Sequence, residues 1–123
     1  LKDGAVATTV AHDSHNLIVI GTSPEAMNVA AKELVRVQGG YTLVKGTKVI
    51  DTLPLNLCGL MSSAPAEELI GSLDEIAAKA HAQGVLDGID PFISLSFMAL
   101  PVIPKLRITD MGMFDTEKFE FIK

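Results

Sequence analysis

Residues 23–53 read SPEAMNVAAKELVRVQGGYTLVKGTKVIDTL, a stretch that predicts one helix followed by a β-hairpin. Ser23 is a favourable N-cap, and Pro24 suits the first helical position. Apolar residues then recur at helical spacing until the glycine pair at residues 39–40, which ends the helix rather than forming a phosphate loop. Two apolar runs follow on either side of the turn at residues 45–47, and this arrangement is typical of a hairpin.

Two further strands are expected before this helix. Residues 5–11 (AVATTVA) are small and β-branched, as in a strand. Residues 17–20 (LIVI) form an uninterrupted apolar run, which is typical of a strand buried on both faces.

A second helix is predicted from Ser63 or Ala64 to a stop at Gly84, with Pro65 inside its first turn. Residues 106–109 and 119–122 are short extended candidates, whereas the apolar residues 92–100 fit no single element. The expected fold class is α+β, a mostly antiparallel β-sheet with two α-helices packed on one face. Residues 1–123 are expected to form a single domain.

Composition excludes several kinds of partner. The net charge is −5 and the ten Lys and Arg residues are scattered, so no basic surface for nucleic acid is expected. Five Phe and one Tyr would make a poor stacking platform for single strands. No apolar stretch reaches the about 20 residues that span a membrane, and the negative charge would be repelled by an anionic lipid surface.

The cysteine content and the first residues indicate where the protein resides. Cys58 is the single cysteine, so no internal disulfide can form, and a reducing cytoplasm is expected. The chain opens on LKDG rather than on Met or a signal peptide, which favours a segment of a longer polypeptide. Its 48% hydrophobic content suggests that part of its surface is covered by something else.

A polar cluster, His12-Asp13-Ser14-His15-Asn16, interrupts two apolar runs and holds most of the functional interest. In an extended segment its neighbours on one face lie about 7 Å apart, too far for a Ser-His-Asp triad. Three interpretations stay open: a turn in which Asp13, Ser14 and Asn16 bond to backbone, a metal site, or a polar loop that faces a ligand or another domain. The metal site is the weakest of these, since only His81 could add a third imidazole.

The cluster also carries a family resemblance. Residues 4–21, GAVATTVAHDSHNLIVIG, resemble the start of the C-terminal domain of bacterial adenine deaminases, in the amidohydrolase superfamily, whose pattern is close to G-x-x-A-x-[ST]-V-A-H-D-S-H-N-[ILV]. Three later stretches agree in order with that family: LPL followed by GLMS at residues 53–62, PFISLSF with ALPVIP at residues 91–104, and LRITDMGMFD at residues 106–115.

This resemblance implies a function in purine salvage, the hydrolysis of adenine to hypoxanthine and ammonia by a metal-dependent hydrolase. In that superfamily a binuclear metal centre, here expected to be Mn or Fe, sits at the mouth of a (β/α)8 barrel of about 250 residues. The chain has no His-x-His signature and no room for such a barrel, which is therefore expected N-terminal to it in the same polypeptide. No metal ligand and no cofactor-binding residue is assigned to this segment.

His12, Asp13, Ser14, His15 and Asn16 are carried over as candidates for a loop near the adenine pocket or the domain interface, not as assigned catalytic residues. The isolated segment is expected to be inactive and to pack on the barrel, shaping its active site. Two alternatives are a non-catalytic purine-binding module and an oligomerisation module, which would form a homo-oligomer.

Overall fold

The computed structural model describes residues 1–122, and a four-stranded antiparallel sheet forms its centre. The strands are β1 (Ala5–Thr8), β2 (Ile18–Gly21), β3 (Gly40–Lys45) and β4 (Lys48–Pro54), in the order β2-β1-β3-β4. The predicted hairpin is β3–β4, and its strands begin and end within one residue of the apolar runs predicted at residues 41–44 and 48–53. This sheet and a second antiparallel sheet near the C-terminus confirm the α+β class.

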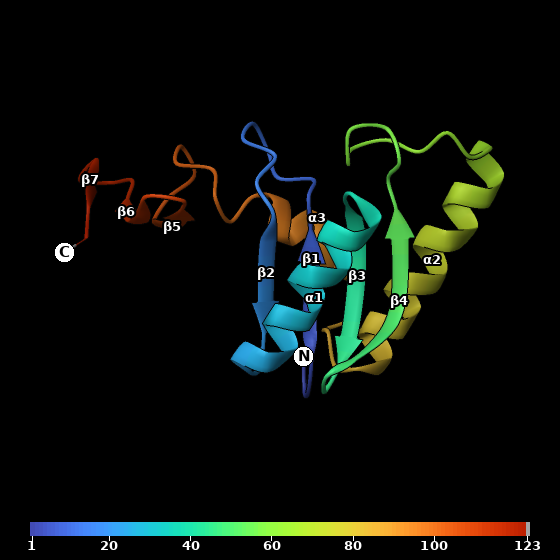
Figure 1. Ribbon diagram of the computed structural model, residues 1–123. Helices are drawn as coiled ribbons and strands as arrows, with labels where there is room; N and C mark the ends of the chain where they lie inside the picture. The colour runs from blue at the N-terminus through green and yellow to red at the C-terminus, as the bar shows by residue number, and fades with distance from the viewer. Residues whose placement is uncertain (123) are drawn as a thin grey trace.

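Three helices cover this sheet, α1 (Pro24–Val37), α2 (Ala66–Ala82) and α3 (Pro91–Ser96). Figure 1 shows α1 in front of the sheet and α3 behind it. Within the described chain, no helix is both long enough and apolar enough to cross a membrane.

The prediction that the two expected helices, now α1 and α2, pack on the same face of the sheet is wrong. Ala5 and Ala7 of β1 pack with α1, whereas Val6 between them packs with α2 and α3 on the opposite face. Successive strand residues point to opposite faces, and every residue of β1 is buried. Both faces of this central strand therefore need a cover, and the helices divide between them.

The prediction that residues 17–20 form a strand buried on both faces is also wrong. β2 pairs only with β1 and lies at the edge of the sheet, and the side chain of Ile20 is 52% exposed. An apolar run predicts burial without saying what buries it, and nothing within residues 1–122 covers this edge completely.

Local signals set the ends of the first helix. Ser23 accepts a hydrogen bond from Ala26 N at 3.1 Å, Pro24 opens α1, and Gln38 caps its C-terminus in the left-handed conformation. The second helix begins at Ala66, later than predicted, because Pro65 occupies the N-cap with extended backbone.

α3 was not predicted, although its cap is readable in the sequence. The carboxylate of Asp90 accepts hydrogen bonds from Phe92 N at 2.8 Å and Ile93 N at 2.9 Å, and Pro91 takes the first helical position. The ring of Phe92 stacks on Tyr41 at 4.6 Å. Burial raises the pKa of the Tyr41 phenol, and the nearby charge of Asp90 adds to this shift.

The C-terminal residues form a small antiparallel sheet of β5 (Leu106–Thr109), β6 (Gly112–Asp115) and β7 (Glu120–Phe121). The extended candidate at 106–109 is confirmed, whereas only two residues of 119–122 are in a strand. Figure 1 shows this sheet set to one side of the main body, beyond β2. Only one of its apolar side chains, Phe114, is buried.

Candidate functional site

The polar cluster lies in the loop between β1 and β2, and all five of its residues are exposed. Its shape is fixed by the main chain. Ser14 N donates to His12 O at 3.0 Å, and His15 N donates to Ala11 O at 2.8 Å. Asp13 and His15 have φ values of 66° and 50°, in the left-handed region that Asp and His tolerate better than most side chains. We refer to residues His12–Asn16 as the polar loop.

The side chains of Asp13, Ser14 and Asn16 take no part in holding the polar loop. Across residues 1–122, no hydrogen bond uses the side chain of Asp13, Ser14 or Asn16, so the expected side-chain bonds to nearby backbone do not form. Polar side chains that satisfy no partner within the domain are available to a partner outside it.

The polar loop is anchored to the C-terminal end of α3. His12 N donates to Ser96 O at 2.8 Å, and the imidazole ring lies 5.3 Å from the ring of Phe97. This contact joins the HDSHN segment to the LSF segment, which is more than 80 residues later in the chain.

A second anchor, at Thr9 between β1 and the polar loop, joins the β1–β2 connection to the segment between β4 and α2. The hydroxyl of Thr9 donates to Gly59 O at 2.7 Å and accepts from Gly40 N at 2.8 Å. Gly39 packs so closely here that an added Cβ would lie 2.6 Å from Gly59 Cα, and its φ of 108° also favours glycine. Thr9, Gly59, Ser96 and Phe97 were not predicted as site residues, although each lies within or beside a motif quoted above.

The segments that carry the family resemblance therefore meet at one end of the sheet. Figure 1 shows the β1–β2 loop and the β4–α2 segment leaving the same end. His81 lies at the other end, since Lys2 N, just before β1, donates to Gln83 O just after α2. The third imidazole thus does not join His12 and His15.

No metal site is formed within the described part of the chain. No three His, Cys, Asp or Glu side chains come together closely enough to hold an ion. Cys58 is exposed in the β4–α2 segment, so it does not fill the core. The polar loop presents hydrogen-bond donors and acceptors at the surface of the domain.

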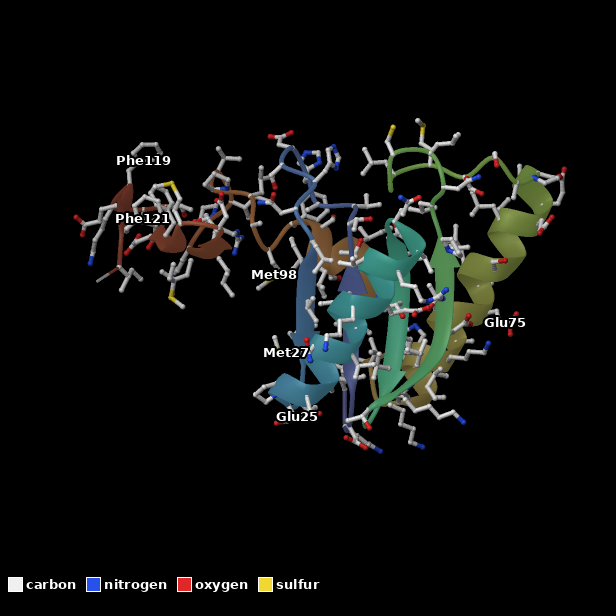
Figure 2. All side chains as sticks on the ribbon, viewed as in Figure 1. Glu25, Met27, Glu75, Met98, Phe119 and Phe121 are labelled. Atoms are coloured by element: carbon white, nitrogen blue, oxygen red, sulfur yellow. The ribbon has the colours of Figure 1, made fainter. Side chains whose placement is uncertain are left out.

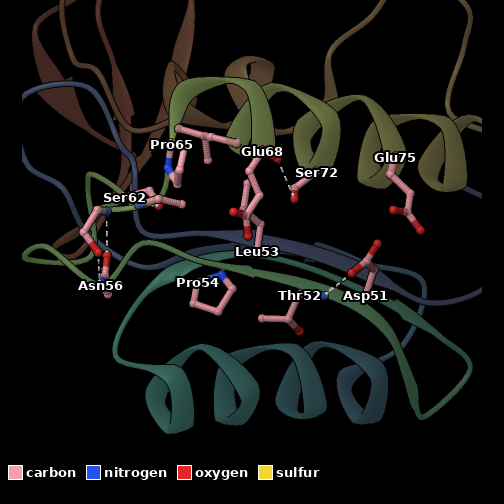
Figure 3. Close-up of a pocket in the computed structure, with 13 residues that line it drawn as sticks. Asp51, Thr52, Leu53, Pro54, Asn56, Ser62, Pro65, Glu68, Ser72 and Glu75 are labelled. Carbon is pink, nitrogen blue, oxygen red and sulfur yellow. Dashed lines mark hydrogen bonds between the residues drawn. The ribbon is translucent and has the colours of Figure 1, made fainter.

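A hollow of about 550 Å³ lies between β4 and α2 (Figure 3). Lys79 Nζ bridges Asp51 at 2.7 Å and Glu75 at 2.6 Å beside it. The hydrogen bond to Asp51, and then the one to Glu75, raises the pKa of the Lys79 ammonium. The single positive charge of Lys79 thus offsets one of the two negative charges of Asp51 and Glu75, and the bridge fastens α2 to β4.

Residues 1–120 match the family model described as adenine deaminase C-terminal domain. The chain belongs to this family.

The curated relatives of this adenine deaminase domain are longer proteins. Adenine deaminase of Desulfitobacterium hafniense is 47% identical over 123 residues, which cover 100% of the chain and 22% of that relative. The protein of the same name in Halalkalibacterium halodurans is 47% identical over 99% of the chain and 21% of its own length, and the one in Nitratidesulfovibrio vulgaris is 48% identical over 98% and 21%. The chain thus spans about a fifth of the length of the relatives it matches.

Proposed function

We propose that this domain serves a full-length adenine deaminase, which hydrolyses adenine to hypoxanthine and ammonia in cytoplasmic purine salvage. In this proposal the domain packs on an N-terminal amidohydrolase barrel of the same polypeptide. The relatives support this assignment by their name and by their length, since about four-fifths of each lies outside the matched region.

The observation that carries the proposal is the convergence of the motif segments around the polar loop. Thr9, just before the polar loop, bonds to Gly59, and His12 N bonds to Ser96, so the polar loop has a fixed position while its side chains remain exposed. We propose that the side chains of His12, Asp13, Ser14, His15 and Asn16 reach the mouth of the barrel and contact adenine or the groups that surround it.

The metal centre belongs to the barrel in this proposal. Bound Mn or Fe would supply the activated hydroxide that attacks the purine ring. The acid and imidazole groups of the polar loop are suited to orienting the substrate or exchanging a proton at that mouth. No step on the metal is assigned to residues 1–123.

A pair of matched substitutions in the full-length enzyme tests the role of the loop. Asp13→Asn removes one charge from the polar loop, and Asp87→Asn removes one from an exposed loop elsewhere. We expect at least a tenfold lower kcat/KM for adenine in Asp13→Asn, about 1.4 kcal/mol of transition-state stabilisation, and no change in Asp87→Asn. Equal kinetics in both variants would refute a role for Asp13 at the active site.

The isolated chain gives the complementary test. With added Mn²⁺ or Fe²⁺ it should release no ammonia from adenine, whereas the full-length protein should. Turnover by the isolated chain would mean that the polar loop assembles a catalytic site of its own, and the proposal that the metal centre lies in the barrel would be wrong.

A further inference from the structure

The outer edge of β2 leaves backbone groups without partners. Two hydrogen bonds, from Thr22 N to Gly4 O (2.8 Å) and from Thr9 N to Gly40 O (3.1 Å), show which residues of β1 bond to which neighbouring strand. Even-numbered residues of β1 bond to β2, and odd-numbered residues bond to β3. In β2 the amides of Ile18 and Ile20 therefore face β1, and those of Val19 and Gly21 face outward from the sheet.

An apolar groove of about 590 Å³ runs beside this edge, between β2, the end of α3 and β5. Figure 2 shows Met98 between the main body and the C-terminal sheet, and Phe119 and Phe121 farther out on that sheet. Ile20 and Ile108, on the two sides of the groove, are 52% and 59% exposed. The apolar residues that line it are Leu17, Ile18, Val19, Ile20, Leu95, Met98, Ala99 and Ile108.

Open strand edges beside apolar grooves bind extended segments, because the backbone bonds give affinity and the groove takes alternate side chains. We infer that an extended segment of the same polypeptide, outside residues 1–123, adds to the Val19–Gly21 edge of β2 and fills this groove. This inference rests on the proposed function, in which the rest of a longer adenine deaminase packs on the domain.

Two observations favour this occupant over a second copy of the chain. Asn16 of the polar loop also lines the groove, so the groove continues the surface that is proposed to face the active site. About four-fifths of the length of the matched relatives lies outside this region. A segment from that part would be tethered to the domain, so its local concentration near the groove would be high.

Photo-crosslinking in the full-length protein tests the occupant. p-Benzoylphenylalanine replaces Ile20 in the groove, or Val35 on the exposed face of α1 as the control, which is 71% exposed. We expect a crosslink within one polypeptide from position 20 to a peptide outside residues 1–123, and none at position 35. A crosslink between two polypeptides would show a second copy in the groove, and no crosslink above the control would show a free edge; either result would overturn the inference.

Hydrogen exchange on the unmodified full-length protein provides a readout that needs no substitution. The amides of Val19 and Gly21 should exchange at least tenfold more slowly than those of the exposed loop at residues 86–88. Exchange as fast as that loop would overturn the inference. Neither experiment depends on adenine turnover, so a failure here is distinct from a failure of the proposed function.

Discussion

The hydroxyl of Thr9 offers the sharpest test of how the motif segments are held together. It donates to Gly59 O at 2.7 Å and accepts from Gly40 N at 2.8 Å, so one oxygen satisfies a carbonyl and an amide on two other segments. Thr9→Val keeps the shape of the side chain and removes both bonds. The amide and the carbonyl then lose their partner in a partly buried place.

The expected cost follows from those two bonds. A partly buried group left unsatisfied costs about 1–3 kcal/mol, and water can reach part of this site, so we expect a loss of about 2 kcal/mol in the free energy of unfolding. For a chain of this size this lowers Tm by about 6–10 °C. Urea and thermal unfolding, followed by circular dichroism, measure both quantities.

Two further variants control this experiment. Thr9→Ser keeps the hydroxyl and should recover most of the lost stability. Thr47→Val makes the same change at an exposed residue of the β3–β4 turn and should stay within about 0.5 kcal/mol of the parent. A Thr9→Val protein as stable as Thr47→Val would refute the reasoning that this hydroxyl fastens the two segments.

Three other predictions concern the backbone, pH and helix capping. Gly39→Ala should destabilise the fold by more than about 2 kcal/mol, because the added Cβ would collide with Gly59. The control Gly71→Ala, in the open middle of α2, should stabilise the fold by up to about 1 kcal/mol. A Gly39→Ala protein that is as stable as the parent in urea unfolding would contradict this reasoning. The hydrogen bond from Arg36 lowers the pKa of the Glu33 carboxyl, so its stabilisation is complete above the ordinary Glu pKa and is lost as pH falls through the lowered value. Thermal unfolding across pH 3–7 should therefore show a shallower acid loss in Glu33→Gln, and parallel curves would count against it. Asp90→Ala removes the N-cap of α3 and should lower the free energy of unfolding by about 1 kcal/mol. The fluorescence of Tyr41 should also change, because its ring stacks on Phe92 of α3. Unchanged stability and fluorescence would show that this cap does not hold α3 in place.

Sequence patterns predicted the elements whose signals are local. The bounds of α1 were predicted from the N-cap Ser23, Pro24 and the glycine pair at residues 39–40. The hairpin was predicted from the two apolar runs on either side of the turn at residues 45–47. The same pattern of Asp90 and Pro91 marks α3, but the helix has only six residues and its apolar sequence also fits a strand. Short apolar segments carry too little periodicity to separate the two.

For the candidate site, the sequence indicated the polar loop but not what holds it. The resemblance drew attention to His12–Asn16, and the exposure of all five residues fits a surface that meets a partner. The anchors Thr9, Ser96 and Phe97 depend on contacts between segments far apart in the chain, which local patterns do not encode.

The sequence by itself determined the family, the helix α1 with its caps, the β3–β4 hairpin and the unusual polarity of residues 12–16. Each of these depends on residues within a few positions of one another, where spacing and side-chain chemistry act directly. Only the tertiary structure decided that the helices divide between the two faces of the sheet, that β2 is an edge strand and that the motif segments meet at one end. These features depend on which strands pair and which faces remain to be covered, and that choice is made by burial summed over the whole chain.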